Sequence, residues 1–146
     1  MAKDIKSEIC KLRKKSTIAY LASVNEAGFP QTKAMLVLER AGIKEHYFST
    51  NTSSQRVQQL LKNPKASVYY CKPNRFKGAL FTGSVQVCTD RATKALLWRR
   101  GFERYYPGGI DDEDYCVLKF TAETVNYYDG KLKNTTLKIE ELTDNG

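Results

Sequence analysis

The sequence lacks the long apolar runs that membrane-spanning helices require. Its longer apolar stretches, such as Ala34 to Leu38, fall far short of the roughly 20 residues needed to cross a bilayer. The N-terminus, Met1 to Ile5, mixes charges with single apolar residues and has no apolar signal core. We therefore expect a cytoplasmic protein with no membrane segment.

The sequence is also poor in metal ligands. It has one histidine, His46, and its four cysteines form no C-x-x-C pair: Cys10, Cys71, Cys88 and Cys116. Because zinc sites cluster their ligands at short spacing, we predict no metal site. Three of the cysteines lie in strand-like runs, where a free thiol behaves as a small hydrophobe.

Length and composition indicate a single soluble domain over residues 1–146. The 146 residues are 41% hydrophobic and 27% charged, and they show no internal repeat and no linker. The net charge of +8 is concentrated at residues 3–15 and 91–104. Such basic stripes can mark nucleic-acid binding. However, the first stripe falls on a predicted helix, where solvated lysines are expected, and the acidic run 111–114 interrupts a continuous basic surface.

The first half of the chain predicts a helix followed by three strands. Ile5, Ile9 and Leu12 share one helical face, which indicates an N-terminal helix within residues 1–16. Alternating and β-branched residues predict strands at 17–24, 31–39 and 43–49, the last two joined as a hairpin. A short helix follows, capped by Ser53 or Ser54 and stopped by Asn63-Pro64.

The second half predicts three further strands and a longer helix. The strands are expected at 66–72, 79–88 and 115–121, and a helix capped by Thr89-Asp90 should run to about Phe102. Gly83 inside a strand suggests a bulge or a close backbone approach. Residues 124–128 form a candidate seventh strand, turned by Asp129-Gly130 into 131–132. The polar tail, 134–146, has sparse Leu and Ile, and its order is left open.

This element order favours a mainly β fold. Six or more strands, with helices confined to one interruption and the two ends, are typical of an antiparallel β-barrel with flanking helices. The same strand count would also suit an OB-like or a lipocalin-like barrel. The pattern alone does not separate these alternatives.

One stretch has the chemistry of a phosphate site. The strand that ends near Thr50 passes through the hydroxyl residues 52–54 into a helix N-terminus. Free backbone N–H groups, hydroxyls and the helix dipole favour an anion there. Arg56 lies one turn into the helix, and Lys33 on the neighbouring strand could supply a second cation. A helix start that is only capped, with no phosphate site, would have the same residues. The choice between these interpretations therefore rests on the whole ordered set of motifs in the chain.

That set resembles the FMN-binding split-barrel family that includes pyridoxamine 5′-phosphate oxidase, and most closely its general stress protein 26-like branch. The resemblance covers roughly residues 5–128. It is carried by Lys33 opening the second strand, Phe48-Ser49-Thr50-Asn51 before the helix, Asn63-Pro64, Phe81-Thr82-Gly83, Leu97-Trp98 and Tyr105 to Gly109.

The resemblance implies a six-stranded antiparallel split barrel and a homodimer with two FMN sites at the subunit interface. Lys33 and Arg56, with Ser53 or Ser54, would hold the FMN phosphate. The isoalloxazine and ribityl region would be lined by Ala34, Met35, Leu36, Ser49 and Thr50. Trp98 and Tyr106 would come from the partner subunit, the alternative being helix packing for Trp98 and loop anchoring for Tyr106.

Departures from the family pattern bear on activity. The oxidase has arginine where Lys33 stands, and arginine binds phosphate bidentately whereas lysine is a point charge. The chain ends at Gly146 without the arginine-bearing segment that grips pyridoxal phosphate, so pyridoxamine phosphate oxidation is not expected. We predict an FMN-binding oxidoreductase of unknown substrate. The choice between FMN, a related flavin and heme is left open.

Two other functions remain as alternatives. A non-enzymatic FMN-binding stress protein would have the same site. A nucleic-acid-binding barrel would instead stack bases on exposed aromatic rings. The candidate rings are Tyr69, Tyr70, Phe76 and Phe81.

Overall fold

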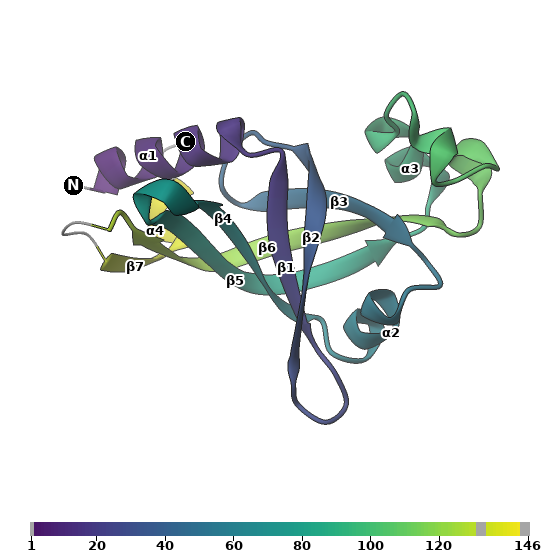
Figure 1. The fold of residues 1–146 in the computed structure, drawn as a ribbon, viewed down its shortest axis with the longest axis horizontal. Helices are drawn as coiled ribbons and strands as arrows, with labels where there is room; N and C mark the ends of the chain where they lie inside the picture. The colour runs from purple at the N-terminus through teal and green to yellow at the C-terminus, as the bar shows by residue number, and fades with distance from the viewer. Residues whose placement is uncertain (1, 131–133, 144–146) are drawn as a thin grey trace.

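The fold is a closed antiparallel β-barrel with flanking helices, as predicted (Figure 1). The computed structural model describes residues 2–130 and 134–143. The sheet order is β3-β2-β1-β4-β5-β6-β7, and a further β3–β6 pairing closes six of the strands into a barrel. The strands are β1 (Ile18–Val24), β2 (Pro30–Glu39), β3 (Glu45–Asn51), β4 (Lys65–Lys72), β5 (Lys77–Cys88), β6 (Tyr115–Tyr128) and β7 (Asn134–Lys138).

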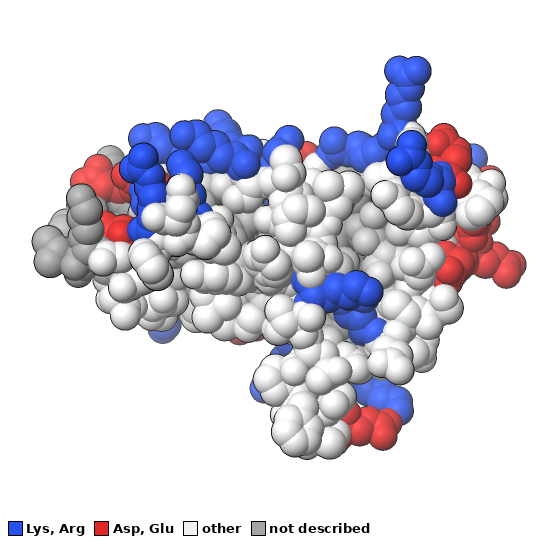
Figure 2. Space-filling model, in the orientation of Figure 1, with Lys and Arg blue, Asp and Glu red and all other residues white. Residues whose placement is uncertain are grey.

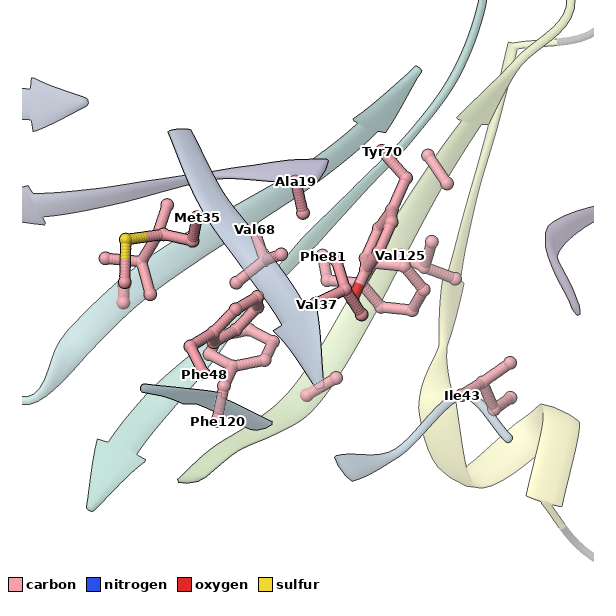
Figure 3. Packing of buried hydrophobic residues seen from close by; sticks show 14 of the residues in the cluster. Ala19, Met35, Val37, Ile43, Phe48, Val68, Tyr70, Phe81, Phe120 and Val125 are labelled. Atoms are coloured by element: carbon pink, nitrogen blue, oxygen red, sulfur yellow. The ribbon is translucent and has the colours of Figure 1, made fainter. Parts of the chain in front are cut away.

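Strand alternation fills the barrel interior with apolar side chains. In β4, for example, Val68 and Tyr70 are buried whereas Tyr69 between them is exposed. Phe48 and Phe120 lie side by side on the paired strands β3 and β6, and Val68 and Phe81 point into the same interior (Figure 3). Each such side chain contributes about 1.5–3 kcal/mol when it leaves water. The predicted hydrophobic pattern therefore accounts for the core.

Helix α1 (Ala2–Lys15) closes one end of the barrel. Its predicted apolar face is buried, with Ile5, Ile9 and Leu12 in the main core. The C-terminal segment packs against this end: β7 extends the sheet beside β6, and α4 (Ile139–Thr143) buries Ile139 and Leu142. Residues 134–143 of the polar tail, whose order was left open, thus form a strand and a short helix.

The predicted sixth and seventh strands are one continuous strand, β6. The pairing of β5 with β6 shifts register between Thr82 and Gly83, so that Glu123 is the extra residue on β6. A Cβ on Gly83 would lie 2.0 Å from the Thr121 carbonyl oxygen. The predicted bulge and close approach at Gly83 are both present, and the bulge replaces the strand break that the sequence suggested. The predicted turn into 131–132 lies outside the described residues.

At the other end of the barrel lie α2 (Gln55–Lys62) and α3 (Arg91–Leu97). The prediction that the second of these helices reaches about Phe102 is wrong. Trp98 is already extended, with φ −62° and ψ 134°, because its ring packs against Phe102 and Tyr115. Gly101 then turns the chain at φ 96° into a short 3-10 helix, Phe102–Arg104.

None of the helices in the described part of the chain is long and apolar enough to span a bilayer. The cytoplasmic location stays a prediction.

Candidate functional site

A hollow of about 390 Å³ lies between β2 and the start of α2. It brings together three of the residues that the sequence singled out, Lys33, Ser54 and Arg56. Strand alternation explains the place of Lys33, because it lies on the same side of β2 as the buried Met35 but beyond the core. The remaining lining residues are Ser23, Gln31, Thr32, Gln55 and Gln59.

The N-terminus of α2 supplies the wall of this hollow. Ser54 is the N-cap, and its Oγ accepts a hydrogen bond from the Val57 N–H at 3.3 Å. Helix geometry leaves the N–H groups of Gln55 and Arg56 without an intrahelical acceptor. Together with the positive end of the helix dipole, these donors favour an anion in the hollow.

Arg56 has a buried atom without a partner, as Arg13 and Thr52 also do. Its side chain is half-buried, and its Nε is fully buried without a hydrogen-bond partner among the described residues. Burial lowers the pKa of its guanidinium, which marks the desolvation of this charge. An unsatisfied buried donor costs about 1–3 kcal/mol, and more when charged. The rest of the guanidinium lines the hollow, where a phosphate could pair with its charge.

The two candidate serines have different surroundings. The Ser53 N–H donates to Asp114 Oδ1 at 2.8 Å, and Asn51 Nδ2 donates to Asp114 Oδ2 at 2.8 Å. Hydrogen bonds from Ser53 and Asn51 hold the pKa of the Asp114 carboxyl below its usual value. Ser53 therefore faces a carboxylate, and only Ser54 lines the hollow with Lys33.

The predicted ring-binding segment of β2 has an open edge. β2 pairs with β1 from Pro30 to Leu36, but it pairs with β3 only at Val37 and Glu39. In the described chain no strand covers the other edge of residues 30–36, so alternate N–H and C=O groups there lack ladder partners. The Met35 side chain is buried in the core, which leaves its main chain for contact with a ligand.

Ser49 and Thr50 of β3 lie close to an aromatic cluster. Its rings are those of Trp98, Phe102, Tyr106 and Tyr115. Thr50 is buried, and its carbonyl accepts a hydrogen bond from the Cys116 thiol at 3.7 Å. Burial raises the pKa of Tyr106, and a hydrogen bond with the Ser49 side chain opposes that shift. Ser49 and Tyr106 thus connect β3 to the aromatic cluster.

Trp98 and Tyr106 belong to that cluster in their own chain. Their ring centroids lie 6.3 Å apart, and Tyr106 lies 4.7 Å from the ring of Tyr115. Tyr106 is buried and Trp98 is half-buried. Within their own chain, Trp98 packs against neighbouring rings and Tyr106 anchors its loop, which are the two alternatives given above for these residues. Their contribution to a partner's site stays a prediction.

Sequence reasoning missed five lining residues of the hollow and the nearby Asp114; the five are Ser23, Gln31, Thr32, Gln55 and Gln59. Gln59 lies three positions after Arg56, and this spacing places both on one helical face, so periodicity could have found it. Asp114 is 61 residues from Ser53 and reaches it only through the β3–β6 pairing. No pattern among neighbouring residues predicts a contact over such a sequence distance.

The aromatic platform proposed for nucleic acid is contradicted by the structure. Tyr70 and Phe81 are fully buried in the barrel core, so they cannot stack on bases. Only Tyr69 and Phe76 are exposed. Lys and Arg side chains gather along α1, while Asp and Glu gather beyond α3 (Figure 2). In the described residues no three His, Cys, Asp or Glu side chains are grouped to hold a metal ion.

Comparisons with known proteins agree with this fold. The family model described as pyridoxamine 5′-phosphate oxidase like matches residues 4–144. A Clostridium acetobutylicum protein related to general stress protein 26 of B. subtilis (pyridoxinephosphate oxidase family) is 43% identical, with a TM-score of 0.88 over 96% of this chain and 98% of that one. No curated protein matches the chain.

More distant structures share the fold. General stress protein 26 of Bacillus anthracis is 18% identical, with a TM-score of 0.77 over 92% of this chain and 98% of that one. A heme binding protein from Mycobacterium smegmatis is 15% identical, with a TM-score of 0.74 over 94% of this chain and 59% of that one. At these identities the likeness concerns architecture alone.

Proposed function

Because the chain belongs to the pyridoxamine 5′-phosphate oxidase-like family, we propose that it is a flavoprotein that binds FMN through its phosphate at Lys33, Ser54 and Arg56. The observation that carries the proposal is the convergence of Lys33, Ser54 and Arg56 on one hollow at the N-terminus of α2. A phosphate dianion there would pair with the Arg56 guanidinium, the free N–H groups of the helix and the Lys33 ammonium together.

The open edge of β2 supports the placement of the flavin ring. Residues 34–36 follow Lys33 directly along β2, and their unpaired main-chain groups can hydrogen-bond to a polar ring edge. FMN supplies the redox chemistry when it is bound, so no side-chain acid or base is required. The protein's part is to hold the phosphate, orient the ring and limit water.

FMN fits this chain better than heme does. The sole histidine, His46, is fully buried, with Nδ1 2.6 Å from the Tyr70 hydroxyl and Nε2 2.9 Å from the Ile43 carbonyl oxygen. Both ring nitrogens are thus engaged inside the barrel. The chain offers no accessible imidazole as a ligand to heme iron.

We further propose a homodimer with the FMN sites at its interface. Exposed apolar side chains form a continuous stripe on the outer barrel face across four strands, because cross-strand partners place Tyr20 beside Tyr69 and Tyr69 beside Leu80. Ile18 and Leu36 extend the stripe, and Leu36 belongs to the proposed ring-binding segment. A second copy on this face would therefore lie beside the flavin ring.

The visible absorption spectrum tests the flavin proposal. We expect the purified protein, or the protein mixed with FMN at micromolar concentration, to show a bound flavin spectrum with quenched fluorescence. A colourless protein that fails to bind added FMN would contradict the proposal. A Soret band that forms on addition of heme, without FMN binding, would favour heme instead.

Light scattering tests the dimer. Tyr20→Glu should convert the dimer to monomer, because it places a charge within the apolar stripe. Phe76→Glu is the matched control, since Phe76 is exposed but lies outside the stripe. A monomeric wild-type protein, or equal effects of the two variants, would contradict the proposed interface.

An electron-transfer assay tests the oxidoreductase proposal. We expect the flavin-loaded protein to oxidise NADH or NADPH faster than the same concentration of free FMN. Turnover equal to that of free FMN would favour the non-enzymatic alternative, in which the same site only holds the flavin.

A further inference from the structure

A second hollow lies at the opposite end of the barrel, between α1 and the β4–β5 hairpin. It has a volume of about 150 Å³ and is lined by four lysines, which come from three elements. Lys11 and Lys15 belong to α1, Lys72 ends β4, and Lys77 begins β5. We call it the lysine hollow. Its remaining lining residues are Glu8, Leu12, Ser16 and Cys71.

The two strand lysines are held beside each other by the sheet. Lys72 and Lys77 are cross-strand partners, so their Cβ atoms lie about 4.5–5.5 Å apart on one side of the hairpin. Strand alternation puts them on the same side as the buried Tyr70 and Ala79 but beyond the core, where α1 packs across β4 and β5. Like charges in directly opposite positions destabilise a sheet.

The helix lysines form a second pair of like charges. Lys11 and Lys15 are four residues apart on α1, and this spacing places both on one face, where they repel each other. The helix dipole stabilises Lys15, because it lies in the last turn, but Lys11 lies before that turn. Glu8, one turn before Lys11, is the one carboxylate among the described residues that line the hollow, so it offsets a single charge.

Ion pairs do not relieve this repulsion. In the described part of the chain, the lysines that form ion pairs are Lys62 and Lys119, and neither lines the lysine hollow. The hollow lies in the region where Lys and Arg side chains gather along α1 (Figure 2). Departures from favourable charge placement are expected where a site serves a function. A bound anion would turn the two repulsive pairs into a binding site.

The size and lining of the hollow limit the kind of anion. A volume of about 150 Å³ is below the range of about 300–1,000 Å³ that is typical of drug-sized ligands. Among the described lining residues there is no aromatic ring on which a nucleobase could stack. The apolar face of α1 is buried in the core, so the helix has no such face to insert into a bilayer. A compact anion of high charge fits these limits.

We infer that the lysine hollow binds a small polyphosphorylated anion of the pyrophosphate class. Lys72 and Lys77 would hold it from the hairpin, and Lys11 and Lys15 from the helix. Each ammonium is a point charge with three donors, which suits phosphate oxygens in any orientation. This inference does not rest on the proposed flavin function, because the lysine hollow shares no lining residue with the hollow beside α2.

Calorimetric titration of the full chain with pyrophosphate at low salt tests the inference. We expect a dissociation constant below about 1 mM, and binding of sulfate that is at least about 10-fold weaker, because sulfate carries less charge. Equal affinities for the two anions would show that the lysines only attract a diffuse ion atmosphere. That result, or the absence of binding, would overturn the inference.

Amide chemical shifts locate the anion. Pyrophosphate should shift the resonances of Lys11, Cys71 and Lys77, which line the lysine hollow. Shifts confined to Gln55 and Arg56 would place the anion in the hollow beside α2 and would overturn the inference.

A matched pair of variants separates this site from a general effect of charge. Lys72→Met should raise the dissociation constant for pyrophosphate by at least about 5-fold. Lys14→Met should leave it within about 2-fold, because Lys14 is exposed on α1 but does not line the hollow. Equal losses would indicate an extended basic face that binds polymers or membranes, and would overturn the inference.

The stability of the Lys72→Met protein without ligand checks for a merely structural role. Its urea midpoint should equal or exceed that of the wild type, because the variant removes one of two like charges in cross-strand positions. A lower midpoint with unchanged pyrophosphate binding would show that Lys72 serves the fold alone, and would overturn the inference.

Discussion

One arginine lies at each end of the barrel, and the two differ in their hydrogen bonds. Arg13, near the end of α1, is fully buried, and its Nη atoms donate to the carbonyl oxygens of Glu39, Ala41 and Gly42 at 2.8, 3.0 and 2.6 Å. Arg56 is half-buried at the start of α2, and its Nε, like that of Arg13, has no partner in the described chain. The three carbonyl acceptors of Arg13 tie its charge to the fold, whereas the Arg56 guanidinium lines a hollow in which a ligand can reach it.

From this contrast between the two arginines, we expect Arg13 to contribute more to the free energy of unfolding than Arg56 does. Arg13→Met removes three charge-assisted hydrogen bonds and the contact of the guanidinium with the Tyr70 ring, whose centroid lies 5.4 Å from Cζ. We expect the free energy of unfolding to fall by about 3–5 kcal/mol, measured by urea denaturation.

The neighbouring exposed residue provides the control for this variant. Lys14→Met should change the unfolding free energy by less than about 0.5 kcal/mol. FMN affinity of the folded Arg13→Met protein should match that of the wild type. A loss below about 1 kcal/mol would show that Arg13 does not secure the β2–β3 turn.

Replacement of Arg56 should change FMN affinity and leave the stability of the flavin-free protein unchanged. Arg56→Met should raise the dissociation constant for FMN about 100-fold, because hydrogen bonds to a charged phosphate are worth about 1.5–3 kcal/mol each. Stability of the flavin-free protein should not fall, since the Arg56 Nε has no hydrogen-bond partner in the described part of the chain that the variant could lose.

Lys62→Met is the control for the loss of a cation from the same helix. Lys62 is exposed and paired with Glu26, so its replacement should change FMN affinity by less than about 3-fold. Equal losses in Arg56→Met and Lys62→Met would mean that α2 attracts FMN only through its overall charge.

Acid should destabilise the whole fold through His46, which lies near Arg13. Burial, followed by the nearby Arg13 charge, lowers the pKa of His46 from 6.5 to about 3. Between these two values the unfolded chain binds a proton that the folded chain does not, so stability falls as the pH drops. The slope approaches about 1.4 kcal/mol per pH unit, which gives a loss of about 2 kcal/mol at pH 5 relative to pH 7.

Urea denaturation across pH 4.5 to 7 measures this slope for the wild type and for His46→Gln. The variant keeps polar atoms beside Tyr70 and Ile43 but has no group that titrates in this window. Its stability should therefore vary less with pH. An equally steep dependence would assign the acid sensitivity to other groups.

The sequence predicted the strands well, because burial on one face imposes a period of two that is visible locally. It also placed Lys33 and Arg56 in one hollow, since a strand end and a helix start each carry their own signal. Two features escaped prediction for the same physical reason. The end of α3 at Leu97 depends on Trp98 packing with Tyr115, and the orientation of Ser53 depends on Asp114, and both partners are remote in sequence.

The neighbouring cation, Lys33, gives the smallest and most discriminating effect. Lys33 is exposed and has no ion pair in the part of the chain that the structure describes, so it sharpens the contrast between a buried and a solvated cation at one phosphate. Lys33→Met should weaken FMN by only about 5-fold at low salt, and by less at high salt, because ions screen an exposed charge. Lys33→Arg should bind at least as tightly as the wild type, since a guanidinium can hold phosphate through two donors. FMN titrations at two salt concentrations measure all three proteins. If the Lys33→Met loss were independent of salt and as large as that of Arg56→Met, Lys33 would be desolvated in the complex, and the two cations would act as one buried pair on the phosphate.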